Sequence, residues 1–121
     1  MNTFLIFIFL LPFIVKFRIS RGMVKNVRFA IAFDLNIEML TKSYGNPYNG
    51  AYGEIKKFLA GKGFDRQQGS LYYGNDSVDA VKAVLAVSSM SKAFSWFAPS
   101  VSDIRLLRIE DDDDLSPALE L

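Results

Sequence analysis

The stretch RFAIAFDL, residues 28–35, alternates large apolar side chains with small or polar ones. Successive side chains of a β-strand point to opposite faces, so this alternation predicts a strand with two unlike faces. The faces carry Val27, Phe29, Ile31 and Phe33 on one side, and Arg28, Ala30, Ala32 and Asp34 on the other. The small residues indicate that something packs closely against the second face. The strand ends on a carboxylate, Asp34, at the rim of that face.

The segments after this strand complete a β-α-β-β-α-β order. We expect a strand at 27–34, a short helical turn capped by Asn36, a main helix within 46–63, a hairpin at 64–74, a second helix within 77–94 and a last strand at 103–110. This order predicts an α+β, ferredoxin-like fold, in which an antiparallel four-stranded sheet carries two helices on one face. We expect Asp76 or Ser77 to cap the second helix, and Val81, Val84 and Leu85 to form its apolar face.

The predicted topology brings three distant segments together at Asp34. The first strand would be central, with the third and fourth strands antiparallel on either side of it. The end of the first strand would then lie beside the beginnings of its two neighbours. The expected neighbours are Gln68, Gly69 and Ser70 on one side, and Ser100, Ser102 and Asp103 on the other.

The face of the sheet away from the helices would be uncovered in a monomer. We expect it to carry Ala30, Ala32, Tyr72 and one side of the strand IRLLRI, residues 104–109. A large apolar surface of this kind is usually buried by a partner. We therefore expect a homodimer, in which two stacked sheets bring both copies of Asp34 near one cleft.

Composition restricts the chemistry. The chain has 121 residues, with neither cysteine nor histidine. The absence of cysteine excludes a disulfide framework and fits a reducing compartment, so we expect a cytoplasmic location. The absence of histidine removes the usual acid–base group near neutral pH. Residues 23–109 hold eleven Lys and Arg against seven Asp and Glu, a net charge of +4 that is compatible with an anionic partner.

The two ends of the chain differ from the middle. The apolar run from Thr3 to Val15 has 13 residues, fewer than the roughly 20 that a membrane-spanning helix needs. Residues 1–22 are either an upstream extension before a natural start at Met23 or a short membrane anchor followed by basic residues, and we favour the extension. We expect a domain at 23–110 and a solvated acidic tail at 111–121.

Five blocks of the sequence carry a family resemblance from about Val27 to the C-terminus. The blocks are FAIAFDL, AYGEIKKFLAGKGF, RQQGSLYYG, WFAPSVSDIRLLRIE and DLSPALEL. In this order they resemble the virulence-associated protein D (VapD) family of bacteria. That family is similar in fold to the small ferredoxin-like nuclease of CRISPR adaptation, and the resemblance implies a dimeric endoribonuclease of a toxin–antitoxin or virulence-associated system. An antitoxin protein is then a candidate partner.

The resemblance also indicates a site. In the nuclease relatives, the aspartate that closes the first strand is the metal or catalytic position, and Asp34 matches it. Mg²⁺ prefers oxygen ligands and needs only one or two carboxylates, so we consider it as the single candidate cofactor. A structural alternative is that Asp34 caps the turn that follows it.

Candidate RNA-binding residues lie near Asp34 in the predicted fold. They are Arg66, Gln67, Gln68, Ser70 and Arg105, which could contact phosphate or a base edge. An ordinary solvated hairpin explains the first four equally well. The leading functional hypothesis is an endoribonuclease, and the alternative is a non-catalytic dimeric module that acts through protein contacts.

Overall fold

The first strand, β1 (Arg28–Leu35), lies in the interior of a four-stranded sheet of order β2-β3-β1-β4. Its neighbours β3 (Leu71–Gly74) and β4 (Val101–Ile109) both run antiparallel to it, as predicted, and β2 (Phe64–Gln68) pairs antiparallel with β3. This structure is a computed structural model, and it describes residues 27–121. The sheet and its helices belong to a unit that spans Arg28–Ile109.

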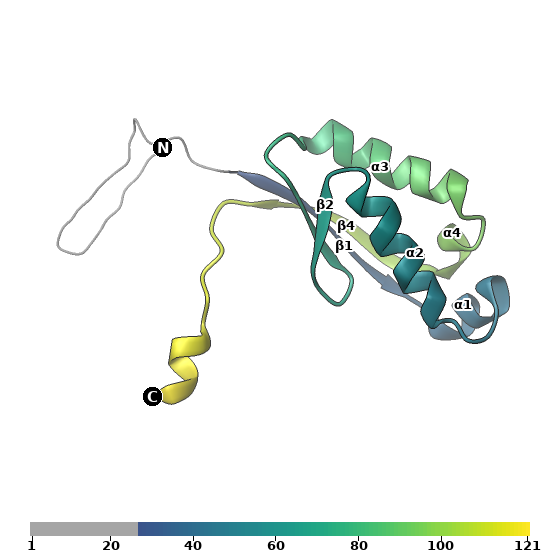
Figure 1. The fold of residues 1–121 in the computed structure, drawn as a ribbon, viewed down its shortest axis with the longest axis horizontal. Helices are drawn as coiled ribbons and strands as arrows, with labels where there is room; N and C mark the ends of the chain where they lie inside the picture. The colour runs from purple at the N-terminus through teal and green to yellow at the C-terminus, as the bar shows by residue number, and fades with distance from the viewer. Residues whose placement is uncertain (1–26) are drawn as a thin grey trace. The chain divides into compact units, whose positions relative to one another are not determined.

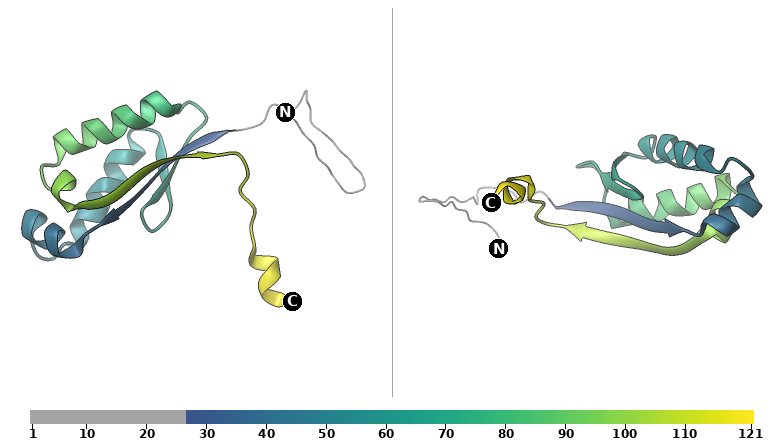
Figure 2. Two further views of the ribbon diagram at one scale, coloured as in Figure 1. Left: turned by 180° about the vertical axis from the view of Figure 1, so that it is seen from behind. Right: turned by 90° about the horizontal axis from the view of Figure 1, so that it is seen from below.

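Two long helices cover one face of this sheet. They are α2 (Asn49–Ala60) and α3 (Ala80–Ala93), and the edge-on view in Figure 2 shows both on the same side. Two shorter helices, α1 (Ile37–Tyr44) and α4 (Phe97–Ser100), lie near the end of β1 (Figure 1). The expected α+β class, with an antiparallel four-stranded sheet and helices packed on it, is confirmed. Within residues 28–109, no helix covers the opposite face.

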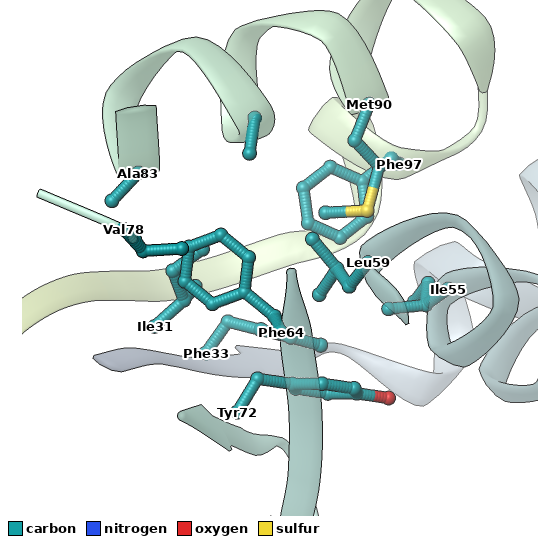
Figure 3. Packing of buried hydrophobic residues seen from close by; sticks show 11 residues of the cluster. Ile31, Phe33, Ile55, Leu59, Phe64, Tyr72, Val78, Ala83, Met90 and Phe97 are labelled. Atoms are coloured by element: carbon teal, nitrogen blue, oxygen red, sulfur yellow. The ribbon is translucent and has the colours of Figure 1, made fainter. Parts of the chain in front are cut away.

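The core lies between the sheet and the two long helices (Figure 3). Aromatic rings connect its layers, because the Phe33 ring stacks on Tyr72 with centroids 5.9 Å apart and meets Phe97 edge-on at 5.7 Å. Such pairs add about 0.5–1.5 kcal/mol each to the effect of area burial. The buried cluster comprises Ile31, Phe33, Ile55, Leu59, Phe64, Tyr72, Val78, Ala83, Ala86, Met90 and Phe97.

The prediction that Tyr72 lies on the open face of the sheet is wrong. Tyr72 is directly opposite Ile31 in the β1–β3 ladder, and cross-strand partners share a face, so Tyr72 belongs to the core. Its neighbour Tyr73 is opposite Ala30 and takes the place on the open face. Two successive tyrosines both fit a half-buried strand, and the register of pairing decides between them.

The start and the buried face of α3 also differ from the expectation. Asp79 caps the helix, since its side chain accepts a hydrogen bond of 2.8 Å from the Lys82 backbone N–H. Asp76 and Ser77 precede the cap, and the Ser77 backbone and hydroxyl groups both donate to the Asn75 side chain. The buried residues of α3 are Ala83, Ala86 and Met90, whereas Val81, Val84 and Leu85 are exposed by 65%, 59% and 58%. Small alanines allow the helix to approach the sheet closely.

Residues 110–121 belong to a second unit, and they contain the short 3-10 helix η1 (Ser116–Glu120). The Asp114 carboxylate accepts hydrogen bonds from the Ser116 backbone and hydroxyl, which lower the pKa of Asp114. Residues 111–121 are exposed, in keeping with a solvated tail. The predictions for residues 1–22 fall outside the described residues. From residue 27 onward, no helix has the length and apolar character needed to cross a membrane.

Two glycines give opposite predictions for stability. A Cβ at Gly53, inside α2, would meet no atom within 4 Å, whereas a Cβ at Gly74 would lie 2.8 Å from Val78 side-chain atoms. We expect Gly53→Ala to raise the free energy of unfolding by about 0.5–1 kcal/mol, because alanine favours a helix over glycine. We expect Gly74→Ala to lower it by about 1–3 kcal/mol through overpacking. Urea unfolding followed by circular dichroism measures both changes, and equal effects would contradict this account of the packing.

Candidate active site

Backbone hydrogen bonds connect the end of β1 to segments on both sides. On the β3 side, the Phe33 N–H donates to the Ser70 carbonyl at 3.1 Å. On the β4 side, the Asn36 N–H donates to the Ser100 carbonyl at 2.7 Å. Asp34 lies between these two bonds, so the backbone around its carboxylate is held from both neighbouring strands.

An open pocket of about 460 Å³ lies at this point. Its lining comes from the end of β1, the β2–β3 turn and the start of β4, which confirms that the three predicted segments converge. We call it the Asp34 pocket. It is lined by Ala32, Phe33, Asp34, Gln68, Gly69, Ser70, Leu71 and Asp103. Ser102 approaches from β4, where its hydroxyl donates to the Asp34 backbone carbonyl at 3.2 Å.

The Asp34 carboxylate does not cap the helix that follows it. Asn36 does so, because its side-chain oxygen accepts a hydrogen bond of 2.9 Å from the Met39 N–H at the start of α1. The capping alternative for Asp34 is therefore wrong. The side chain of Asp34 is exposed, and no residue from 27 to 121 donates a hydrogen bond to its carboxylate or forms an ion pair with it. It is thus available to a ligand.

A second carboxylate faces Asp34 across the strand pair. Asp103 of β4 is directly opposite Asp34, and such partners have Cβ atoms about 4.5–5.5 Å apart. Like charges at this position destabilise a sheet unless another charge compensates them. Arg105 compensates the charge of Asp103, because its Nε lies 3.0 and 3.1 Å from the two Asp103 carboxylate oxygens. The pairing is irregular between Asp34 and Leu35, and bulges of this kind often re-aim a side chain beside an active site.

Asp103 is the functional candidate that sequence reasoning missed. It was predicted to be a neighbour of Asp34, but it was not considered as a ligand. The signal was available, since antiparallel pairing of the two strands places the end of one opposite the beginning of the other. Asp34 and Asp103 together are the carboxylates that could hold a cation here. Within residues 27–121, no group of three or more His, Cys, Asp or Glu side chains is placed to hold one.

The predicted RNA-binding residues are divided between different surfaces. Gln68 and Ser70 line the Asp34 pocket, and Arg105 contacts it through Asp103. Arg66 is opposite Tyr72 in the β2–β3 ladder, on the helix side of the sheet, and it lines a separate pocket. Gln67 lines another one, with Arg28 and Asp65 among its neighbours. The irregular pairing between Arg66 and Gln68 accounts for this division, which alternation alone would not reveal.

A pair of substitutions separates capping from ligand binding. We expect Asn36→Ala to lower the free energy of unfolding by about 1 kcal/mol, the usual effect of losing an N-cap. Asp34→Asn should leave it unchanged or raise it slightly, because one of two facing negative charges disappears. Urea unfolding at neutral pH and low salt measures both values. A loss on Asp34→Asn as large as that on Asn36→Ala would show that the carboxylate has a structural role.

Comparison with known proteins identifies the family, although no protein-family model matches this chain. The chain is 42% identical over 92 residues to "Endoribonuclease VapD 2" of Riemerella anatipestifer, an alignment that covers 75% of this chain and 98% of that protein. It is 49% identical over 88 residues to "Endoribonuclease VapD" of Dichelobacter nodosus, with 73% and 92% covered. It is 38% identical over 93 residues to "Endoribonuclease VapD homolog" of Helicobacter pylori, with 77% and 97% covered. Identity at this level over nearly the whole length of the relatives confirms the resemblance, and the chain therefore belongs to the virulence-associated protein D (VapD) family.

Proposed function

We propose that this chain is an endoribonuclease that cleaves RNA in the Asp34 pocket. One observation carries the proposal: an exposed carboxylate without a partner among residues 27–121 lies in an open pocket where three segments converge. The names of its relatives, which are called endoribonucleases, support RNA as the substrate. Because the chain has no histidine, a carboxylate is the natural group for proton transfer or metal binding here.

The residues of the pocket suit a hard divalent cation such as Mg²⁺. Mg²⁺ is usually held by one or two carboxylates and keeps waters and substrate phosphates as its other ligands. Asp34 and Asp103 would supply those carboxylates from one chain. A bound cation would activate a water molecule and neutralise charge on the phosphate during cleavage. It would also remove the repulsion between the two facing carboxylates.

Three further residues have proposed roles in holding RNA. The Nε of Arg105 is used by Asp103, and its Nη groups make no hydrogen bond with any residue from 27 to 121. They are positioned to donate to a phosphate beside the carboxylates. Gln68 and Ser70 lie on the other side of the pocket, where their amide and hydroxyl groups can contact sugar or a base edge.

We also propose a ferredoxin-like homodimer that forms through the open face of the sheet. With Tyr72 moved to the core, the apolar residues of this face are Ala32, Leu71, Tyr73, Leu107 and Ile109, whereas Ala30, also predicted to be uncovered, is fully buried between its neighbours. Within residues 28–109 no helix covers this face (Figure 2), and an uncovered apolar face is usually buried by a partner. Stacking two copies would bring their Asp34 pockets towards one cleft. The toxin–antitoxin context, the antitoxin partner and the cytoplasmic location implied by the sequence remain predictions.

RNA cleavage by purified protein tests the proposed activity. We expect wild-type protein with Mg²⁺ to cleave a defined single-stranded RNA, and Asp34→Asn to lower the rate by about two to four orders of magnitude, the range for loss of a positioned acid or base. Asp76→Asn, which changes an exposed carboxylate before α3 and outside the Asp34 pocket, is the matched control and should cleave normally. Circular dichroism checks that the wild-type protein and both variants are folded.

The controls separate the parts of the proposal. Full cleavage in EDTA would refute the metal requirement while leaving Asp34 as a direct acid or base. Full cleavage by Asp34→Asn would refute the assignment of the site. Absence of cleavage by folded wild-type protein, with RNA of several sequences, would favour the alternative of a non-catalytic binding module.

The dimer has its own test. Leu107 is opposite Ala30 on the open face and lies outside the Asp34 pocket, so Leu107→Arg should place a charge in the interface and shift the protein to a monomer. Val84→Arg adds the same charge to the exposed surface of α3 and should leave the mass unchanged. Light scattering coupled to gel filtration measures the masses. Identical masses for all three proteins would exclude a dimer through this face.

A further inference from the structure

A second pocket of about 490 Å³ lies between α2 and the β2–β3 hairpin. It shares Gly69 and Ser70 with the Asp34 pocket, so one two-residue turn separates the two. Its volume is within the range of about 300–1,000 Å³ that is typical of small-molecule sites. We call it the α2–hairpin pocket, and it is lined by Tyr52, Gly53, Lys56, Arg66, Gly69, Ser70 and Tyr72.

The side chain of a buried tyrosine reaches this pocket. Tyr72 is only 2% exposed, and its ring stacks on Phe33 in the core. Figure 3 shows its hydroxyl at the edge of the buried cluster, on the side of α2. No residue from 27 to 121 forms a hydrogen bond with this hydroxyl. Because this pocket is open, the hydroxyl can form a hydrogen bond with water or with a ligand that occupies the pocket.

The pocket carries positive charge and no acidic residue. Lys56 reaches it from α2 and Arg66 from β2, and neither Asp nor Glu is part of its lining. The Arg66 Nε donates to the Gly69 carbonyl at 2.8 Å, which holds the guanidinium beside the turn. Burial raises the pKa of Tyr72 and the charge of Arg66 partly offsets this effect, as expected for two groups that are close together. The charge of this pocket is opposite to that of the Asp34 pocket.

The surface of α2 leaves space at this pocket. Gly53 lies within the helix, where glycine is less favourable than alanine, yet no neighbouring atom requires its small size. The space above it opens into the pocket. Tyr52 stands beside it, with its ring half-buried and edge-on to Tyr48 at a centroid distance of 6.4 Å. An aromatic ring next to two cations is typical of sites that hold single-stranded nucleic acid.

We propose that the α2–hairpin pocket binds one nucleotide of single-stranded RNA, adjacent to the phosphodiester in the Asp34 pocket. Lys56 and Arg66 hold its phosphate, the Tyr52 ring stacks on its base, and the Tyr72 hydroxyl bonds a base edge or the 2′-hydroxyl. The RNA strand passes over the turn formed by Gly69 and Ser70, two residues that line both pockets. The assignment of RNA as the ligand rests on the proposed endoribonuclease function.

Binding of labelled hexauridylate, measured by fluorescence anisotropy in the Asp34→Asn protein, tests this pocket without cleavage. Adding Lys56→Gln should lower the slope of log affinity against log salt by about 0.7, the value for one phosphate contact in a single strand. Lys57→Gln is the control, since Lys57 is the next residue of α2, is exposed and lies outside the pocket. Tyr72→Phe removes only the hydroxyl and should weaken binding several-fold while the protein stays folded.

The outcomes separate this pocket from the proposed activity. Equal losses on Lys56→Gln and Lys57→Gln would overturn the proposal, because a diffuse cationic surface behaves in that way. Displacement of hexauridylate by uridine monophosphate at equal concentration would overturn it in favour of a mononucleotide site. Binding that depends on Lys56 and Tyr72, together with wild-type protein that cleaves no RNA, would support the pocket and refute the endoribonuclease.

Discussion

The register of β1 against its two neighbours is the constraint on which the rest of the structure depends. Ile31 is opposite Tyr72 on one side and Leu106 on the other, and this register directs the large side chains of β1 towards α2 and α3. The same register places Asp34 opposite Asp103 on the other face. A slip of one residue would exchange the faces, exposing the core aromatics and burying a carboxylate. The core and the candidate active site are therefore specified by one pairing.

At the end of β1 the side chain of Asp34 is exposed, whereas that of the next residue, Leu35, still packs against the core. Backbone bonds to the β2–β3 turn and to α4 end the strand from both sides, and Asn36 starts α1 with its own cap. These backbone groups therefore form their hydrogen bonds without the Asp34 carboxylate. Asp103 differs, because Arg105 already neutralises it. Because of this asymmetry the negative charge of Asp34 is uncompensated by residues 27–121, which makes Asp34 the stronger candidate for binding a ligand.

Sequence reasoning predicted the features that follow from alternation and element order. These are the strand at β1, its antiparallel neighbours, the cap at Asn36 and the convergence of three segments on Asp34. It was wrong where two patterns fit equally well. Either face of α3 has helical spacing, and only packing against the sheet selects the alanine face over Val81, Val84 and Leu85. Neither of two adjacent tyrosines in β3 could be assigned to a face without the register.

The two pockets were not distinguishable from sequence for a related reason. The run RQQGS, residues 66–70, looks like one polar turn, but irregular pairing in the β2–β3 ladder sends Arg66 to the helix side and leaves Gln68 at the Asp34 pocket. The α2–hairpin pocket also needs α2 beside the hairpin, a contact between elements that no local pattern encodes. The sequence signals this pocket only through Gly53, because this glycine lies inside a helix at a position where packing does not require a glycine.

Opposite charges on the two sides of one turn have a thermodynamic consequence for the proposed function. A polyanion that enters the α2–hairpin pocket is attracted by Lys56 and Arg66, but its next phosphate meets the field of Asp34. A cation bound between the carboxylates, as proposed, would convert that repulsion into attraction. Metal binding and RNA binding would then be coupled, and by linkage each would raise the affinity of the other by the same factor. Because Gly69 and Ser70 line both pockets, such coupling would act through the charges of the two sites and would need no change in fold.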